Sequence, residues 1–479
     1  MSSLSIDYII IIVYLIAIAA FGIISGGKQK TTSDYFSGSK TIPWWAVCFS
    51  IVAAETSTLT FISIPGLAYL TNLNFLQVTF GFLLGRIVVA YVFLPVYDKG
   101  GLKTAYTYLE DRFGKKTRSF ASIVFLFTRT AADGVRLFAT AIPLKLMLDI
   151  SYPTAIIIIA IFSLIYTYTG GLKGIIWVDV IQMFIYIGGA IIAGIFIINL
   201  LPNGMKSVFD AADSANKFSV LNLGFSAGLK NFFSNPYTLF GGIFGGMFLS
   251  MASHGTDQLI VQRLFATKNL RDGQKAVIGS GIIIVIQFTI FLILGVMLYA
   301  YYGSINVKSD EIFPMFIIKV LPAGVTGIII AGLFAAAMST LAASMSSLSS
   351  STILDLYLPF TKKKLDENKK LKYSRLVTVF WAILLIFSAI FFMETSKAVV
   401  EIALSIASFT YGGLLGTFLL GIFVKNAKQN TALFGFSMGI ITMTIIISFH
   451  LVSWTWFTLI GVFATIIFGK LFLLFQRKR

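Results

Sequence analysis

The feature that most constrains this chain is an apolar stretch at 44–69 with a polar centre. The stretch is long enough to cross a bilayer, which takes roughly 20 apolar residues, yet residues 53–60 read AAETSTLT. An ionised group at the bilayer centre costs roughly 2.5 kcal/mol or more. Backbone leaves the helical conformation at lipid depth only where protein encloses it. A broken, polar helix at mid-membrane therefore indicates a binding site for a solute and an ion.

The composition agrees with a membrane protein. Hydrophobic residues make up 57% of the chain and charged residues 12%, and the mean hydropathy is +0.88; a soluble domain carries about 25% charged residues. The single cysteine, Cys48, excludes internal disulfides. The first apolar segment has no Lys or Arg before Lys28, so we expect a retained span instead of a cleaved signal peptide.

Apolar segments recur along the whole chain, and we count thirteen. They lie near 6–25, 44–69, 74–97, 119–147, 154–168, 174–201, 232–262, 273–302, 313–350, 373–393, 397–424, 430–449 and 453–473. Several exceed the length of a perpendicular span, which predicts tilt or kinks. The sequence therefore predicts an all-α integral membrane protein with about 13 transmembrane helices, forming one domain over residues 1–479.

The net charge of +17 is unevenly distributed between the two sides. Of the 37 Lys and Arg residues, 27 fall in the C-terminal tail and in the loops on its side, against five in the opposite loops. This asymmetry follows the positive-inside rule and places the N-terminus outside and the C-terminus in the cytoplasm. We expect a multi-pass protein of the cell (plasma or inner) membrane. The partner of its positive charge is then the lipid bilayer and not nucleic acid.

Several function classes lack their sequence signatures. The chain has no Walker A sequence, no Gly-rich nucleotide loop, no metal-spaced Cys/His cluster and only two histidines. These absences argue against an ATP-driven pump or a histidine-based hydrolase, so we expect no enzyme activity and no nucleotide. The energy source is then an ion gradient, or transport is passive.

A second candidate site element is the stretch 331–351, which is rich in Ala and Ser. On a helix, Ala336, Ser339 and Thr340 stand at i, i+3 and i+4 and share one face. Two hydroxyls on that face, with backbone carbonyls from a broken partner helix, would make a five-oxygen cage suited to a small hard cation. Small residues also permit close packing of membrane helices. Spacing alone favours packing.

Further motifs accompany these two elements. They are TGGLKGIIWVDVIQ at 169–182, AYTYLEDRF at 105–113 and VQR at 261–263. Together with 53–66 and 331–351, they make the chain resemble, over nearly its whole length, the sodium:solute symporter family. That family includes bacterial sodium/galactose, sodium/sialic acid and sodium/proline transporters.

The resemblance implies a LeuT-like core of two inverted five-helix repeats, about 44–201 and 232–424. One helix leads, and two helices at about 430–473 trail. Independent support comes from residues 250–257, which read SMASHGTD. They interrupt the first helix of the second repeat as residues 53–57 interrupt that of the first. Paired interruptions at corresponding places point to the binding site.

The resemblance also implies a sodium site. Its ligands would be the carbonyl or side-chain oxygens of Ala53, Thr56, Ala336, Ser339 and Thr340. Asp179 falls on the family's sodium exit route, although a pairing with Lys173 is the alternative. Some relatives bind a second sodium ion through two serines where this chain has Ala342 and Ala343. We therefore expect one sodium ion.

The solute site implied by the resemblance lies beside the first break. The residues that would face it are Glu55, Ser57, Thr60, Thr79, Ser250, Ser253 and His254. Glu55 stands where relatives carry a neutral polar residue. A carboxylate there attracts a cationic or amino group of the solute, or is neutralised by an arginine of the protein.

Suitable arginines lie in the next two spans. Arg129 and Asp133 stand at i, i+4 and can pair along their own helix. Arg136 or Arg86 then remains for Glu55 or for a solute carboxylate. The sialic acid branch uses an arginine that aligns with Ala132, so Arg136 lies one turn further on. A structural charge network and direct solute contact both remain open.

The expected function is sodium-coupled import of a small polar organic solute by alternating access. Sugar, sialic acid, amino acid and carboxylate solutes are all compatible with the polar residues above. A proton-coupled symporter of the same fold is the alternative, because Glu55 and Asp179 can be protonated. A channel or a solute sensor is a more distant alternative.

Overall fold

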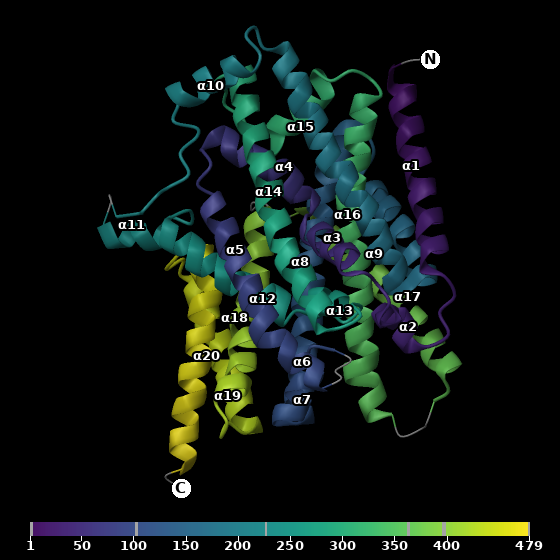
Figure 1. The fold of residues 1–479 in the computed structure, drawn as a ribbon, viewed down its shortest axis with the longest axis vertical. Coiled ribbons are helices and arrows are strands. Elements are labelled where there is room, and N and C mark those ends of the chain that lie inside the picture. Colours follow the sequence, from purple (N-terminus) through teal and green to yellow (C-terminus); the bar gives the residue numbers. More distant parts are fainter. Residues whose placement is uncertain (1–2, 101–103, 226–227, 362–364, 395–398, 478–479) are drawn as a thin grey trace.

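The computed structural model describes residues 3–100, 104–225, 228–361, 365–394 and 399–477. These residues form helices joined by turns, with one isolated bridge between Ile42 and Thr267. The long helices run along one axis of the molecule, and the two termini lie at opposite ends of it (Figure 1). The predicted all-α class is therefore confirmed.

The helices of the first half of the chain carry both ends of the first break. They are α1 (Ser3–Gly26), α2 (Thr32–Ser37), η1 (Gly38–Lys40), α3 (Trp44–Glu55), α4 (Thr58–Leu70), α5 (Leu76–Val88), η2 (Val89–Phe93), α6 (Leu94–Gly100), α7 (Thr107–Phe113), α8 (Lys115–Leu148), α9 (Tyr152–Leu200), α10 (Met205–Ser214) and α11 (Gly228–Ser234).

The helices of the second half carry the second break and the Ala- and Ser-rich stretch. They are η3 (Gly241–Gly245), α12 (Gly246–Gly255), α13 (Gln258–Leu264), α14 (Leu270–Tyr302), α15 (Ser309–Lys319), α16 (Val325–Ser351), η4 (Thr352–Tyr357), η5 (Leu358–Phe360), α17 (Glu367–Phe391), η6 (Phe392–Glu394), α18 (Val399–Phe423), α19 (Gln429–Ser448) and α20 (Trp454–Arg477).

Eight helices among the described residues are long and apolar enough to cross a membrane. They are Ile6–Gly26, Leu76–Gly100, Tyr152–Leu200, Leu270–Tyr302, Val325–Phe360, Glu367–Phe391, Gln429–Ser448 and Trp454–Gln476. Helices α3 and α4 pass the same test as a pair that is bent by 68°. Helices α8, α12–α13 and α18 lie at other predicted segments. The multi-pass class is confirmed, whereas the count of thirteen and the layout of the repeats remain predictions.

The structure keeps the division between one pair of predicted segments and divides another segment. Segments 154–168 and 174–201 meet at a kink in α9, where Gly171 adopts the non-helical φ 55° and ψ −160°. Glycine reaches this conformation without the steric cost of a Cβ, and the Tyr35 carbonyl oxygen lies 2.9 Å from where a Cβ would stand. Segment 313–350 is divided instead, because α15 ends at Lys319 and α16 begins at Val325.

Helix α16 lies within the bundle and is the most buried of the apolar spans. It contacts α9, α1, α8 and α17, and every residue from 329 to 351 is buried. The Ala and Ser side chains of this helix allow neighbouring backbones to approach closely. The packing role suggested by the spacing is therefore present, and it places the candidate oxygen ligands in the protein interior.

Both predicted helix breaks are present, but each is shorter than predicted, because residues 53–55 remain in α3 and residues 250–255 remain in α12. At the first, Thr56 (φ −79°, ψ 101°) and Ser57 (φ −88°, ψ 168°) are extended, and the Ser57 side chain caps α4. At the second, Asp257 is extended (φ −79°, ψ 122°), and its carboxylate accepts a hydrogen bond from the Leu259 amide at 2.9 Å. Ser and Asp are favoured caps because their side-chain oxygens satisfy amides left free at a helix start.

One loop residue is anchored onto the end of α4. Lys217 follows α10, and its Nζ donates to the carbonyls of Tyr69 at 2.6 Å and Thr71 at 3.0 Å. It also lies 4.2 Å from the centre of the Tyr299 ring. Burial lowers the pKa of Lys217, because the charged form is less well solvated there. This contact ties the 202–231 connection to the helix that begins at the first break.

The predicted orientation rests on the distribution of basic residues between the two sides. Some of the basic residues counted for it lie outside the described residues, namely Lys103, Lys362, Lys363, Lys364, Lys397, Lys478 and Arg479. The N-out, C-in arrangement remains a prediction.

Candidate ion and solute site

The five residues proposed as sodium ligands come from α16 and from the first break. All are buried, and the least buried, Thr340, is 6% exposed. Helix α16 contacts both α3 and α4. The Thr58 hydroxyl donates to the Leu333 carbonyl at 3.1 Å, which joins the start of α4 to α16 one turn before Ala336. The structure thus holds the broken helix against the helix that carries the candidate hydroxyls.

The hydroxyl hydrogens at this site already have acceptors. Thr340 donates to the Ala336 carbonyl at 3.1 Å, and Ser339 donates to Asp179 Oδ1 at 2.7 Å. Thr56 donates to the Val52 carbonyl at 2.8 Å and accepts from Gln287 at 2.7 Å. Because the hydrogens of Ser339 and Thr340 point to these acceptors, the oxygen lone pairs remain as the groups that can meet a cation.

Asp179 is fully buried and is held by three donors. Ser50 donates to it at 2.5 Å, Ser339 at 2.7 Å and Arg263 at 3.0 Å. Its ion-pair partner is therefore Arg263 and not the alternative, Lys173. Sequence reasoning included Arg263 only as part of a motif, and it missed Ser50, which lies one turn before Ala53 and Ala54.

Glu55, the last residue of α3, pairs with Arg86 of α5. Arg86 is fully buried and also donates to the Ser280 hydroxyl at 2.8 Å, whereas the Glu55 side chain is 24% exposed. His254 Nε2 lies 3.6 Å from the same carboxylate. Of the two arginines left open for Glu55, the structure thus selects Arg86. The carboxylate still has an exposed part that can accept further hydrogen bonds.

The other candidate solute residues differ in availability. Thr79 and Ser250 are buried, and their hydroxyls donate to the carbonyls of Leu76 and Phe82. Ser57 and Thr60 lie together, with hydroxyl oxygens 3.4 Å apart. Ser253 is partly buried and contacts His254 Nδ1 at 2.8 Å. Thr60, Ser253 and Glu55 keep exposed surface near the break, whereas Thr79 and Ser250 serve helix packing in this conformation.

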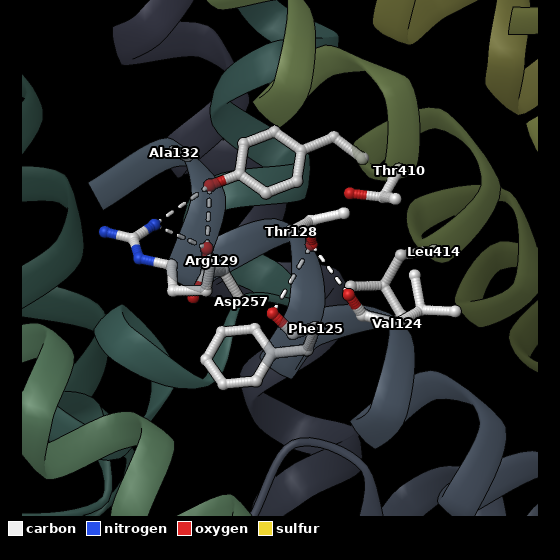
Figure 2. A pocket seen from close by; sticks show the side chains of 9 residues that line it. Val124, Phe125, Thr128, Arg129, Ala132, Asp257, Thr410 and Leu414 are labelled. Atoms are coloured by element: carbon white, nitrogen blue, oxygen red, sulfur yellow. Dashed lines mark hydrogen bonds and ion pairs between the residues drawn. The ribbon is translucent and has the colours of Figure 1, made fainter. Parts of the chain in front are cut away.

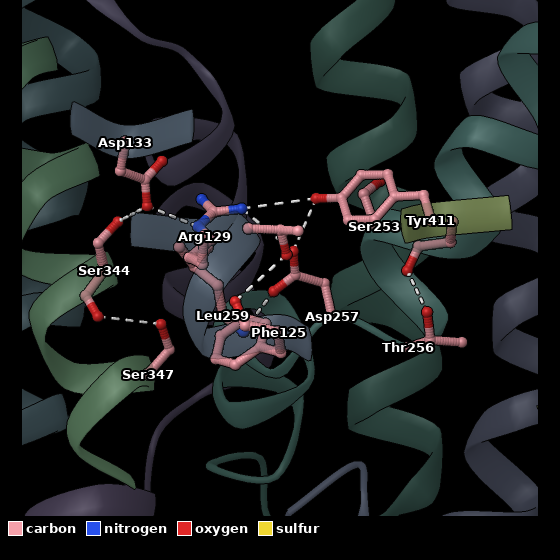
Figure 3. Close-up of polar contacts among 12 residues, drawn as sticks. Phe125, Arg129, Asp133, Ser253, Thr256, Asp257, Leu259, Ser344, Ser347 and Tyr411 are labelled. Carbon is pink, nitrogen blue, oxygen red and sulfur yellow. Dashed lines mark hydrogen bonds and ion pairs between the residues drawn. The ribbon is translucent and has the colours of Figure 1, made fainter. Parts of the chain in front are cut away.

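A second group of charges surrounds the other break (Figure 3). Arg129 donates to Asp133 at 2.6 Å and to Asp257 at 3.1 Å, and Asp257 also accepts from Tyr411 at 2.7 Å. Ser344 of α16 donates to Asp133. The predicted pairing of Arg129 with Asp133 is thus confirmed. The links to Asp257, Tyr411 and Ser344, which join α8 to α13, α18 and α16, were missed.

Arg136 belongs to the edge of this group. Its Nη1 lies 3.4 Å from Asp133 Oδ1, and its side chain is 24% exposed. With Arg129, Asp133 and Asp257 it makes two positive and two negative groups, so the cluster is electrically balanced. The ion pair between Arg136 and Asp133 is the longest in this cluster. Arg136 is therefore the member that another anion can approach.

A cavity of about 20 Å³ lies beside Arg129 (Figure 2). It is lined by Val124, Phe125, Thr128, Arg129, Ala132, Asp257, Thr410, Tyr411 and Leu414. A cavity needs roughly 10–15 Å³ to hold one water molecule, so this space suits a water and not an organic solute. It belongs to the packing around the second break.

The fold and these two breaks define a class. An all-α membrane bundle with paired broken helices, one of them held against buried hydroxyls of a central helix, is the architecture of an ion-coupled transporter. The sequence comparison then gives the family. Residues 35–439 match the model of the sodium:solute symporter family, and the chain belongs to that family.

Individual relatives agree with this assignment. The sodium/sialic acid symporter NanT of Aliivibrio fischeri is 30% identical over 98% of this chain and 92% of its own length. The sodium/sialic acid symporter SiaT of Proteus mirabilis is 30% identical over 91% and 88%. The sodium/glucose cotransporter of Vibrio parahaemolyticus is 26% identical over 90% and 83%.

Solved structures give the same result. A Na⁺-coupled sialic acid symporter in a substrate-bound outward-open state superposes with a TM-score of 0.87 and 28% identity, covering 97% of this chain and 96% of that one. A nucleobase-cation-symport-1 family transporter in a closed conformation superposes with a TM-score of 0.58 at 11% identity, over 91% and 92%, and so shares the fold alone. Sodium-coupled solute import, predicted from the sequence, is confirmed at the level of the family.

Proposed function

We propose that one sodium ion binds between the first break and α16 and drives import of one small polar solute bound beside it. The carbonyls of Ala53, Thr56 and Ala336 and the hydroxyls of Ser339 and Thr340 supply five neutral oxygens. The observation that carries the proposal is the bond from Ser339 to Asp179. This bond directs the Ser339 hydroxyl hydrogen to Asp179, so that the oxygen lone pairs can face a cation. It also places the Asp179 carboxylate directly behind Ser339.

Asp179 assists this ion indirectly, through its hydrogen bond with the proposed ligand Ser339. Its carboxylate is engaged by Ser50, Ser339 and Arg263. A dehydrated sodium ion at Asp179 would need further oxygens, and the neighbouring positions on α16 are Ala342 and Ala343. Methyl groups cannot replace hydroxyl ligands. We therefore assign Asp179 to the exit route of a single ion.

The solute lies next to the exposed part of Glu55. A carboxylate accepts hydrogen bonds from hydroxyl or N–H groups, which sugars, amino acids and sialic acid all present. Arg86 and Arg129 are already paired with carboxylates. Arg136, with its loose contact to Asp133, is the arginine best placed to meet a solute carboxylate. Ser57, Thr60 and Ser253 supply the remaining polar contacts.

The membrane arrangement completes the proposal. The N-terminus lies outside and the C-terminus in the cytoplasm of a plasma or inner membrane, as the distribution of basic residues predicts. Import then runs from the N-terminal end of the bundle toward the C-terminal end.

A thermal-shift screen in sodium identifies the solute first. Galactose, N-acetylneuraminate, proline and pyruvate represent the four compatible classes, and a ligand of the folded state raises the unfolding midpoint. Uptake of the selected solute into proteoliposomes is then measured under a sodium gradient at fixed pH. Uptake that follows a proton gradient without sodium would instead assign the proton-coupled alternative.

Variants test the sodium ligands in the same assay. Ser339→Ala and Thr340→Ala each remove one oxygen, and hydrogen bonds to charged groups are worth about 1.5–3 kcal/mol. We expect the half-saturating sodium concentration to rise by roughly tenfold or more in each, since tenfold corresponds to about 1.4 kcal/mol. Unchanged sodium dependence in both variants would exclude this site.

The flux ratio tests the number of ions. A sodium-to-solute ratio near one with a hyperbolic sodium dependence fits a single site. A ratio near two with a sigmoidal dependence would refute it.

A further inference from the structure

A large cavity lies where α18 ends, α19 begins and α20 ends, next to α7, and none of its lining residues belongs to either break. Its volume is about 710 Å³. It is lined by Arg112, Phe113, Lys425, Asn426, Ala427, Lys428, Gln429, Leu473 and Gln476. Helices α19 and α20 lie at the side of the bundle, at the end of the molecule that carries the C-terminus (Figure 1). The cavity therefore sits at one end of a helix pair on the rim of the bundle.

The charge of this cavity is one-sided. Three of its nine lining residues, Arg112, Lys425 and Lys428, are cationic, and none of the nine is acidic. Both lysines are exposed. Three like charges around one space repel each other in the empty site and attract an anion into it.

Arg112 is fixed in place without being neutralised by the groups it binds. Its Nε donates to the Gly421 carbonyl at 3.0 Å and its Nη1 to the Ala427 carbonyl at 3.0 Å. Its Nη2 donates to the carbonyls of Val424 at 2.7 Å and Lys425 at 2.8 Å. These acceptors hold the guanidinium at the end of α18 while carrying no formal charge. The positive charge is thus held rigidly at the wall of the cavity.

Exposed apolar side chains stand close in sequence to residues that line the cavity. Phe423 is 67% exposed, Leu474 is 56% exposed and Phe475 is 70% exposed. Phe423 directly precedes the segment that carries Lys425 and Lys428, and Leu474 and Phe475 follow the lining residue Leu473. In a protein whose outer surface meets lipid, exposed large apolar groups of this kind face the acyl chains. A polar, cationic cavity close to such residues is expected at the level of the lipid headgroups.

We propose that this cavity binds the headgroup phosphate of an anionic phospholipid. Lys425 and Lys428 contact the phosphate from the exposed side, Arg112 provides fixed positive charge behind it, and the acyl chains run along the apolar surface near Phe423 and Phe475. Basic pockets between transmembrane helices bind lipid headgroups in this way. Free phosphate shares the anion chemistry, but it gains nothing from the apolar surface.

The test uses the purified full-length protein in neutral detergent. The thermal unfolding midpoint is followed during titration with phosphatidylglycerol, with phosphatidylcholine, and with glycerol 1-phosphate at matched phosphorus concentration. We expect phosphatidylglycerol to raise the midpoint by several degrees, through mass action on the folded state. Phosphatidylcholine and glycerol 1-phosphate should raise it by less than half as much.

Matched variants assign the effect to this cavity. Lys425→Gln with Lys428→Gln removes two charges at the cavity, and Lys206→Gln with Lys308→Gln removes two from exposed positions that lie outside it. The first pair should need at least threefold more phosphatidylglycerol for the half-maximal shift, and the second pair should behave as the unmodified chain. Arg112 is left intact because it also ties down the end of α18.

Three results would overturn the proposal. They are an equal response to phosphatidylcholine, an equal response to glycerol 1-phosphate, and an unchanged response in the Lys425 and Lys428 variant. Stabilisation of that variant by sodium, which does not involve the cavity, serves to show that the variant is folded.

Discussion

The two helix breaks use the same backbone device with different consequences. At each, a helix stops, and an extended residue with a capping side chain starts the next helix: Ser57 at the first break and Asp257 at the second. At the first break, the carboxylate of Glu55 pairs with Arg86 and keeps an exposed part. At the second, Asp257 is buried and its carboxylate is bound by Arg129, Tyr411 and the Leu259 amide.

This difference separates a break that can receive ligands from a break that holds helices together. At the first break, the Thr58 hydroxyl bonds to α16, and the partly exposed carboxylate of Glu55 pairs with Arg86 of α5. The second uses its carboxylate on α8 and α18, where the adjacent cavity of about 20 Å³ leaves no room for a solute. A polar interruption in a membrane helix is therefore not by itself a ligand site. Whether such an interruption can bind a ligand depends on whether its hydrogen-bond acceptors are still free of protein partners.

The largest expected effect comes from disrupting the charge cluster at the second break. Asp257→Asn removes one negative charge from the balanced cluster and leaves Arg129, 7% exposed, with Asp133 alone. Breaking a buried ion pair by removing one partner costs about 3–5 kcal/mol. We expect a lower unfolding midpoint and a reduced yield, with an unchanged sodium affinity in the protein that folds. Thermal unfolding with and without sodium measures both quantities.

A milder variant at the same place serves as the control. Tyr411→Phe removes one hydrogen bond to Asp257 and keeps the charges, so the loss should be about 1 kcal/mol. Equal stability of Asp257→Asn and the unmodified chain would show that the second break does not hold the helices.

Sequence reasoning found much of this arrangement, but not all of it. The position of both breaks followed from polar residues inside apolar stretches, and the i, i+4 pairing of Arg129 with Asp133 followed from helical geometry. The partners Ser50, Arg263, Ser280 and Tyr411 were not foreseen, because they lie on other helices and their spacing carries no signal. A buried charge in the sequence predicts that a partner exists; which residue it is depends on how the helices pack.

Segment boundaries show the same limit. The gap between the predicted segments 154–168 and 174–201 coincides with the kink at Gly171 in α9. Apolar composition does not distinguish a kink from an end. Segment 313–350 was predicted as one, although Pro322 lies between α15 and α16.

An intermediate effect is expected from the exposed carboxylate of the first break. Glu55→Gln keeps the shape but removes the charge that we propose to face the solute, and a hydrogen bond to a charged group is worth about 1.5–3 kcal/mol. The solute concentration for half-maximal uptake should therefore rise by roughly tenfold to a hundredfold. The loss of stability should be smaller than for Asp257→Asn, because Glu55 is partly exposed.

Ser280→Ala provides the control for this variant. It removes the other side-chain partner of Arg86, at 2.8 Å, without touching Glu55. If Ser280→Ala changes solute affinity as strongly as Glu55→Gln, the carboxylate acts only by holding Arg86. Normal transport with unchanged affinity in Glu55→Gln would make Glu55 peripheral to the solute.

The smallest effects come from two hydroxyls of α16 that stand one turn apart and serve different breaks. Thr340 is a candidate sodium ligand, whereas Ser344 donates to Asp133 in the second cluster. Thr340→Ser keeps the oxygen and loses a methyl group, so the half-saturating sodium concentration should change by less than about twofold.

Ser344→Ala removes one bond to a buried carboxylate that retains Arg129, which should cost about 1.5 kcal/mol of stability with no change in sodium dependence. Uptake against sodium concentration and thermal unfolding, measured on both variants, separate the two roles. A change in sodium dependence in Ser344→Ala would mean that the two breaks share one ion site, and the distinction drawn between them would then fail.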